Sequence, residues 1–276
     1  MEKELLRRVQ LAQLEIAKEL KRVCDENGIR YFMDSGTLLG AVRHKGFIPW
    51  DDDMDFGMMR DEYERFLKIA PEKLSDEYFL QTWESDHYYG MPFAKLRKKG
   101  TRYVERNSER SKAHNELFID IFPYNSYPDS EEDRKQQGFE IKKDFTSLLG
   151  LSGATPWLQY QNPVKRASSR LKFLGVTLYG KLAGRENLIR KYTEAATRFN
   201  GQMTKNVFEE GGSAAYDSWV VSRKCFDAYQ TLLFEGVEFS APADADTYLR
   251  DVYGDYMQLP PVEERENRHQ VLEVKL

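Results

Sequence analysis

Cysteine is scarce in this chain of 276 residues, which contains only Cys24 and Cys225. The two lie far apart without a Cys-x-x-Cys spacing, so the pattern argues against a disulfide framework and a cysteine zinc site. Long apolar runs are also missing: no stretch approaches the roughly 18 consecutive residues of a transmembrane helix, and Met1–Arg8 lacks the apolar core of a signal peptide. We therefore expect free thiols and a cytoplasmic protein without a membrane span.

Charge of one sign is not in large excess. The chain has 41 lysines and arginines against 45 aspartates and glutamates, a formal net charge of -4. No global basic field draws such a protein to nucleic acid, which we do not expect as a partner. Hydrophobic residues make up 41% of the chain, enough for one substantial core or two modest ones.

The hydrophobic pattern mixes two periods. Apolar residues recur every three or four positions from Leu6 to Val23, with Gln13 as the one polar break, and this predicts an amphipathic helix ending at Asn27-Gly28. Further helices are predicted at about 38–44, after residue 60, over most of 128–206 and from an Asp244 or Asp246 cap to Gly254. Strands are predicted at 30–34, 51–57, 93–97, 101–105 and 117–122, with a hairpin at 232–239.

Residues 1–127 form the predicted core, 128–215 a mainly helical insert, and 216–276 a C-terminal hairpin and helix that complete the active-site region. Gly211-Gly212-Ser213 is predicted to be a hinge or loop. The turn Lys99-Gly100 is expected to join the strands at 93–97 and 101–105 into an antiparallel pair. Pro123 is expected to end the buried strand at 117–122.

The aspartate run Trp50-Asp51-Asp52-Asp53-Met54-Asp55 carries the clearest chemistry. On a strand, side chains alternate, so Asp53 and Asp55 point to one face while Met54 and Phe56 pack into the core. Neighbouring carboxylates repel one another unless a cation holds them, and hard oxygen ligands suit magnesium or manganese.

Two other interpretations of the run are weaker. A solvated acidic loop would lie in polar sequence, whereas this run is flanked by Phe47-Ile48-Pro49-Trp50 and Phe56-Gly57-Met58-Met59. Four acidic residues occupy positions 1, 3, 5 and 12 of a calcium-binding EF-hand loop, but Phe56 stands where that loop needs glycine.

The segment Tyr31-Phe32-Met33-Asp34-Ser35-Gly36-Thr37-Leu38-Leu39-Gly40-Ala41-Val42-Arg43-His44, followed by Gly46-Phe47-Ile48-Pro49-Trp50-Asp51-Asp52-Asp53-Met54-Asp55, closely resembles the LicD family. Its members include phosphocholine transferases and relatives of fukutin, within the nucleotidyltransferase superfamily. The resemblance covers nearly the whole chain and is weakest from about 130 to 215. It implies an α+β fold, with a mixed sheet flanked by helices.

Carried over by position, Gly36-Thr37 stands at the glycine turn of the superfamily, and Asp53 and Asp55 at its metal-binding pair. Asp120 is the best match to the third carboxylate. The gap between the turn and the aspartates is longer than in many members, which leaves Asp51 as a rival for one metal position.

The resemblance implies a phosphotransferase that uses Mg²⁺ or Mn²⁺ held by Asp53, Asp55 and Asp120, which are also the expected catalytic residues. The donor would be a CDP-alcohol such as CDP-choline, and the acceptor a cell-surface glycan such as teichoic acid or lipooligosaccharide. Two alternatives stay open: a nucleotidyltransferase that moves a nucleoside monophosphate to a small alcohol or antibiotic, and a non-catalytic metal-binding scaffold.

Ser35, Gly36 and Thr37 are expected to bind the donor phosphate, because a helix start presents free N–H groups. Lys95 and Arg97 alternate on one strand face and are further candidates for that role. We give Arg43 and His44 less weight, and core packing is the favoured interpretation of Tyr248, Tyr253 and Tyr256 over a base or choline pocket.

The segment from Phe145 to Gly184 contains no aspartate or glutamate but five basic residues among apolar ones. This pattern suits a helix on an anionic lipid surface, at the inner face of the membrane, where a lipid-linked acceptor would be carried. Because Gly175 and Gly180 weaken a helix, an ordinary packed insert fits equally well.

Overall fold

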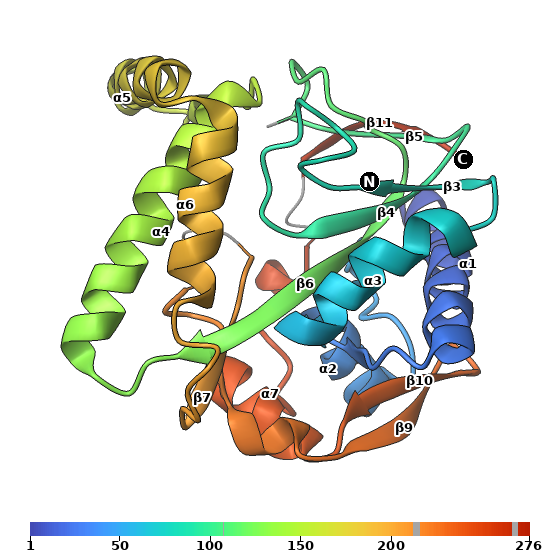
Figure 1. Ribbon diagram of the computed structural model, residues 1–276. Helices are drawn as coiled ribbons and strands as arrows, with labels where there is room; N and C mark the ends of the chain where they lie inside the picture. The colour runs from blue at the N-terminus through green and yellow to red at the C-terminus, as the bar shows by residue number, and fades with distance from the viewer. Residues whose placement is uncertain (107, 212–215, 267–269) are drawn as a thin grey trace.

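The computed structural model describes residues 1–106, 108–211, 216–266 and 270–276, and a mixed sheet lies at its centre (Figure 1). The order across the sheet is β1-β2-β6-β4-β3, and β7 and β8 extend it beside the second half of β6. β2 and β6 are parallel, whereas the other neighbours are antiparallel. The strands are β1 (Phe32–Met33), β2 (Asp55–Met59), β3 (Tyr78–Gln81), β4 (Ala94–Lys98), β6 (Phe118–Tyr127), β7 (Asn206–Glu209) and β8 (Val220–Ser222).

Helices flank this sheet and dominate the middle of the chain, so the predicted α+β fold with a largely helical insert is confirmed. Among the described helices, none combines the length and apolarity that a membrane span requires. The α-helices are α1 (Lys3–Asn27), α2 (Ser35–His44), α3 (Arg60–Lys73), α4 (Glu131–Leu151), α5 (Pro163–Ala183), α6 (Arg185–Thr197) and α7 (Ala245–Tyr253), with short 3-10 turns at Pro156–Gln159, Arg223–Phe226 and Val262–Glu264.

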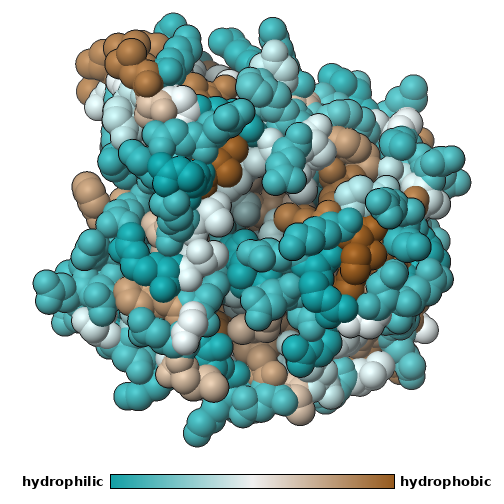
Figure 2. Space-filling model, in the orientation of Figure 1, coloured by the Kyte–Doolittle hydropathy of each residue, from teal (hydrophilic) through white to brown (hydrophobic). Residues whose placement is uncertain are grey.

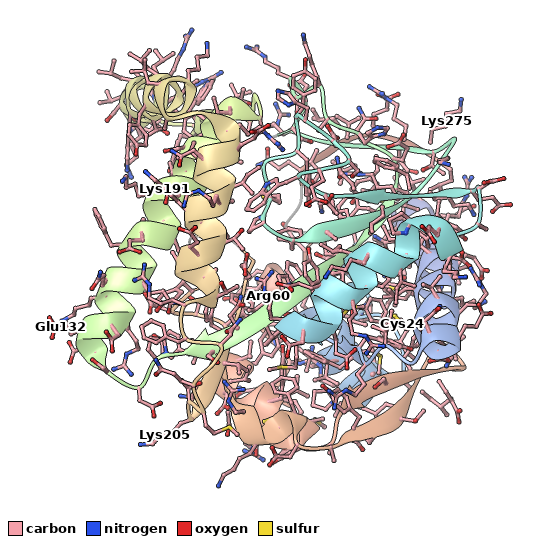
Figure 3. The ribbon with its side chains drawn as sticks, viewed as in Figure 1. Cys24, Arg60, Glu132, Lys191, Lys205 and Lys275 are labelled. Carbon is pink, nitrogen blue, oxygen red and sulfur yellow. The ribbon has the colours of Figure 1, made fainter. Side chains whose placement is uncertain are left out.

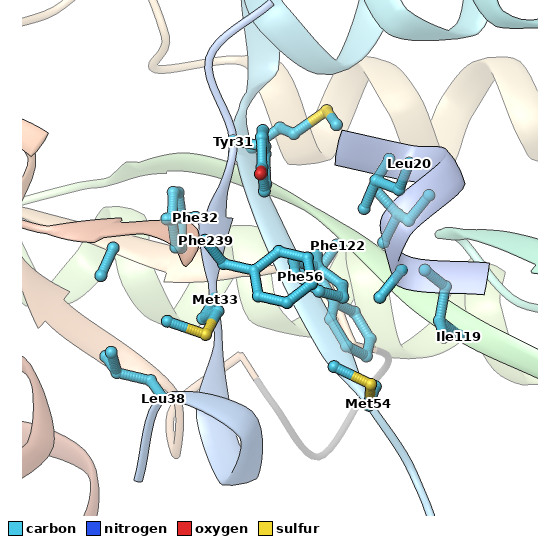
Figure 4. Close-up of a cluster of buried hydrophobic side chains, with 14 of the residues drawn as sticks. Leu20, Tyr31, Phe32, Met33, Leu38, Met54, Phe56, Ile119, Phe122 and Phe239 are labelled. Atoms are coloured by element: carbon cyan, nitrogen blue, oxygen red, sulfur yellow. The ribbon is translucent and has the colours of Figure 1, made fainter. Parts of the chain in front are cut away.

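The main core forms where the apolar face of α1 packs against the sheet and the C-terminal hairpin. Leu20 of α1, Phe56 of β2 and Phe239 of the hairpin are all fully buried (Figure 4). Burying each such side chain contributes roughly 1.5–3 kcal/mol, so the region beside the aspartate run is firmly packed. Gly28 ends α1 in the left-handed conformation, at φ 60°, as the Asn27-Gly28 pattern predicts.

β6 continues through Pro123, although the sequence predicts that this proline ends the strand. The N–H of Asp120 donates to Met54 O on the β2 side, so the missing N–H of Pro123 would point to the opposite edge. On that edge β4 pairs only up to Ile121, and β7 begins its pairing at Tyr124. Pro123 therefore lies at a change of partner, where the strand needs no donor.

The predicted pairing of the strands around Lys99-Gly100 is wrong. Gly100 does adopt a left-handed turn, but the second strand, β5 (Arg102–Glu105), pairs with β11 (Val271–Lys275) near the C-terminus. The hairpin predicted at 232–239 exists as β9 (Tyr229–Phe234) and β10 (Val237–Pro242). Gly212 and Ser213 of the predicted hinge lie outside the described residues.

Candidate active site

The aspartate run leads into β2. Asp55 begins the strand, and the four residues before it have no regular structure, so the strand starts later than predicted. Met54 and Phe56 are fully buried, whereas Asp53 and Asp55 are half-buried and line a cavity. The predicted separation of an acidic face from an apolar face is thus present.

Asp120 reaches the same cavity from the neighbouring strand. β2 and β6 run parallel with Asp55 directly opposite Asp120. Paired residues of neighbouring strands project to the same face of a sheet, and both carboxylates do line the cavity. The sheet register therefore brings together two aspartates that are far apart in the sequence.

Two buried glutamines of α1 hold the aspartate run by its backbone. Gln10 Nε2 donates to Asp51 O at 2.8 Å, and Gln13 Nε2 donates to Asp52 O at 2.8 Å. Each such hydrogen bond has a net value of about 1 kcal/mol, and losing the donor would leave a buried carbonyl unsatisfied. Gln13, the polar break in the α1 stripe, is thus a contact between this helix and the site.

Asp52 is held through its side chain. It is only 2% exposed, and its Oδ2 accepts a hydrogen bond from the Tyr103 hydroxyl. One carboxylate oxygen from each of Asp51, Asp52 and Asp53 lies within 4.8 Å of the others. Oxygen ligands about 2.1–2.6 Å from a divalent cation lie at most about 5 Å apart, so these donors fit such an ion.

α2 begins one residue before the glycine, under strain. Ser35 has φ 43°, in the left-handed region that a residue with a side chain rarely adopts. Asp34 caps the helix, because its Oδ1 accepts a hydrogen bond from the Ser35 N–H at 2.8 Å. The same oxygen also accepts a hydrogen bond from the Tyr124 hydroxyl at 2.8 Å. The Tyr248 hydroxyl contacts the same oxygen, and as favoured from the sequence, Tyr248 is a fully buried core residue.

Thr37 connects α2 to the aspartates. Its Oγ1 accepts the N–H of Asp55 at 2.8 Å, and the residue is 3% exposed. Ser35 and Gly36 line the cavity, whereas Thr37 is not one of the described residues along its wall. The structure therefore gives the Thr37 side chain a contact with the backbone of the metal-site candidate, and not a place facing a ligand.

The cavity has a volume of about 730 Å³. A chain of hydrogen bonds that sequence reasoning missed crosses its wall: Trp219 Nε1 donates to Ser35 Oγ at 2.8 Å, and Ser35 Oγ donates to Glu209 Oε2 at 3.2 Å. Glu209 ends β7, inside the region predicted as a helical insert. No local pattern marks it, because only the pairing of β7 with β6 brings it to the aspartates.

Carboxylates crowd the floor of the cavity. Burial raises the pKa of Asp55 well above its usual value, and the charges of Asp53, Asp120, Asp34 and Glu209 raise it further. Burial also raises the pKa of Glu209 well above its usual value, with Asp34 adding to this effect. A bound cation would relieve this repulsion, which is a second reason that the site fits a metal ion.

Lys95 and Arg97 share a strand face, as predicted, but neither is among the described residues that line the large cavity. Lys95 Nζ lies 2.5 Å from Asp120 Oδ1 and 3.4 Å from the centre of the Phe118 ring. Arg97 Nε donates to Gln81 Oε1 at 2.6 Å. Both line a separate cavity of about 150 Å³. Lys95 thus contacts the site through Asp120, whereas Arg97 contacts Gln81.

Arg43, which the sequence made only a weak candidate for phosphate binding, lies in the cavity wall. Arg43 Nη1 donates to Tyr256 O at 2.7 Å, and burial lowers the pKa of Arg43. Tyr253 also lines the cavity, and burial raises the pKa of its hydroxyl well above the usual value, with Asp55 the next cause. The cavity wall therefore includes a cation from α2 and an aromatic ring from the C-terminal segment.

Comparison with known proteins places this geometry in a family context. The sequence profile of the LicD/FKTN/FKRP nucleotidyltransferase domain matches residues 28–149, which include the aspartate run and Asp120. Lipopolysaccharide cholinephosphotransferase LicD of Haemophilus influenzae is 31% identical over 281 residues, covering 98% of this chain and 97% of that protein.

Two shorter matches fall on other proteins. An uncharacterized protein of Rickettsia typhi is 44% identical over 62 residues, which are 22% of this chain and 20% of that protein. Human ribitol 5-phosphate transferase FKRP is 42% identical over 48 residues, covering 17% of this chain and 10% of that protein.

Proposed function

Because this chain belongs to the LicD family, we propose that it transfers a phospho-alcohol from a CDP-linked donor to a hydroxyl of a cell-surface glycan. The chain is a phosphotransferase, and the near full-length similarity to a cholinephosphotransferase is the observation that carries the activity. Phosphocholine is the proposed group, and a teichoic acid or a lipooligosaccharide the proposed acceptor. CMP would be the second product.

The proposed metal ligands are Asp53, Asp55 and Asp120, which line the same cavity, with Asp51 as a rival for one of these positions. The fit rests on the crowding of carboxylates around Asp55 and, for Asp51 and Asp53, on carboxylate oxygens that lie within 4.8 Å of each other. When bound, Mg²⁺ or Mn²⁺ would neutralise charge on the donor diphosphate and on the phosphoryl group in transit.

In the proposed reaction, side chains of the cavity position the reactants and accept the proton of the acceptor hydroxyl. The acceptor oxygen forms a bond to the phosphorus of the transferred group, the bond from that phosphorus to the CMP oxygen breaks, and CMP leaves with the electron pair. Glu209 is a proposed acceptor for the hydroxyl proton, because it lines the cavity and its Oε2 accepts a hydrogen bond from Ser35 Oγ. Asp120 is the alternative base, and Lys95 holds its Oδ1.

Donor phosphate would be bound by the first turn of α2. Ser35 and Gly36 line the cavity, and the N–H groups of a first helical turn have no acceptor within the helix. Arg43, on the last turn of the same helix, is a proposed contact for a phosphate oxygen. Thr37 is proposed to act at one remove, by fixing the Asp55 backbone.

The deciding experiment incubates the purified chain with a panel of CDP-alcohols, Mg²⁺ or Mn²⁺, and a glycan acceptor, and follows donor loss and CMP formation. Release of CMP with phosphorylated acceptor is the expected result. A nucleotidylated acceptor with pyrophosphate would instead support nucleotidyl transfer. Turnover of UDP- or GDP-sugars without turnover of any CDP compound would refute the donor class.

Variants separate catalysis from folding. Asp53→Asn and Asp55→Asn should abolish CMP formation, while Asp76→Asn, a change at an exposed aspartate, should retain it. Asp55→Asn should also raise the melting temperature of the metal-free protein, since it removes a buried charge that its neighbours repel. If metal and CDP-alcohol gave no thermal shift and both site variants melted like the wild type, the enzyme proposal would give way to a scaffold.

A further inference from the structure

Helix α5 carries apolar side chains on the face that turns away from the protein. Leu171 is 72% exposed and Leu182 is 82% exposed, and three further residues of the helix, Val164, Leu174 and Leu178, are exposed as well. Figure 2 shows hydrophobic atoms gathered over α5 at the upper left of the molecule. We call these five side chains the apolar stripe.

Helical geometry places the stripe opposite the packed face. At about 100° per residue, the five side chains fall within a sector of about 80°. Phe173 and Gly180, the buried residues of α5, lie on the other side of the helix. There Phe173 packs on Trp157, and the absent side chain of Gly180 lets the helix approach Leu151 of α4. Gly180 thus serves helix packing.

Basic residues border the stripe on both sides. The same geometry places Arg170 and Lys181 about 20–40° beyond one edge, and Lys172 and Lys165 about 80–100° beyond the other. Arg166 is the fifth basic residue of the helix, and residues 145–184 contain no aspartate or glutamate. Since the whole chain has a formal net charge of -4, this helix is a local exception to its charge balance.

We propose that α5 docks this protein on an anionic lipid surface and lies in the plane of the bilayer. The apolar stripe would enter the boundary between headgroups and acyl chains, and the flanking lysines and arginines would contact lipid phosphates. A second copy of the chain fits the stripe poorly, because two such helices face to face would oppose five basic residues with five more and bring no carboxylate from this segment.

The docking inference goes beyond the proposed function and does not depend on it. If the acceptor glycan is carried on a membrane lipid, α5 would keep the cavity close to its substrate. Binding to lipid is measured without donor, acceptor or metal, so failure of vesicle binding and failure of transfer are separate outcomes.

Vesicle flotation tests the proposal with the full-length protein. We expect it to float with vesicles of phosphatidylcholine containing phosphatidylglycerol, to stay behind with phosphatidylcholine alone, and to be released by rising salt. The triple variant Leu171→Gln, Leu178→Gln, Leu182→Gln should lower the partition coefficient roughly tenfold or more. Phe139→Gln, at a residue of α4 that is 70% exposed, is the matched control and should bind as wild type.

Gly175 offers a variant that gains binding. It lies about 20° beyond one edge of the stripe, and a Cβ built there meets no atom within 4 Å. Gly175→Leu should therefore strengthen vesicle binding about tenfold, with the urea midpoint of the variant measured to show that it remains folded. Wild-type protein that ignores anionic vesicles would overturn the proposal. So would a triple variant that binds like wild type, or one whose only change is the loss of a dimer in gel filtration.

Discussion

Substituting Thr37 by valine isolates one hydrogen bond of the site. Valine keeps the branched shape of threonine and removes only the oxygen that accepts the Asp55 N–H at 2.8 Å. Thr37 is 3% exposed, so water has little access to replace the lost acceptor. An unsatisfied buried donor costs about 1–3 kcal/mol, and in a chain of this size each kcal/mol lowers the melting temperature by about 2–4 °C.

Urea unfolding and CMP formation together test this reasoning. Thr37→Val should shift the urea midpoint to lower concentration and reduce kcat, because Asp55 loses its backbone anchor, while Thr37→Ser, which keeps the oxygen, should stay near wild type. If Thr37 instead bound the donor phosphate, valine would raise KM for the donor and leave stability unchanged. That second pattern would refute the structural role.

Three more substitutions probe charge and space around the cavity. In Gly36→Ala, the new Cβ would lie 2.8 Å from Asp51 Oδ2, so CMP formation should fall while the melting temperature drops by less than about 3 °C. Arg60 lies at the start of α3 (Figure 3) and forms an ion pair with the buried Glu210. Arg60→Met should therefore lower the free energy of unfolding in urea by about 3 kcal/mol, because it leaves a buried carboxylate without its partner. Adding Glu210→Gln to this variant should restore part of the lost stability. Burial raises the pKa of Asp34 to about 6. The native state then binds more protons than the unfolded state between about pH 4 and 6, so stability falls by up to roughly 3 kcal/mol as pH rises through this window. Asp34→Asn should flatten that slope in urea titrations at several pH values, and an unchanged slope would exclude Asp34 as its source.

The sequence predicted those parts of the site that depend on local pattern. The alternation around Met54 and the apolar face of helix α1 each identify side chains that must face the core, because the pattern is local to its own segment. The family resemblance points to Asp120 as a partner of Asp55, and the parallel register of β2 and β6 places the two side by side. The core-facing residues and the role of Asp120 could both be predicted because short segments of the sequence contain the relevant pattern or motif.

Residues that reach the site through long-range pairing left no such signal. Glu209 follows a predicted helical region and joins the cavity only because β7 pairs with β6. Lys95 and Arg97 illustrate the opposite failure, because alternation places them on one face but cannot say what covers that face. In the fold Lys95 contacts the Phe118 ring and Arg97 contacts Gln81, and both line the smaller, separate cavity.

The way in which the aspartate run is fastened decides which variants report on chemistry. Gln10 and Gln13 hold the carbonyls of Asp51 and Asp52, and Thr37 holds the N–H of Asp55. These contacts go to the backbone, so exchanging a carboxylate for an amide leaves them in place. Loss of activity in Asp53→Asn or Asp55→Asn can therefore be assigned to the missing charge, whereas loss in Gln13→Leu would reflect a displaced loop.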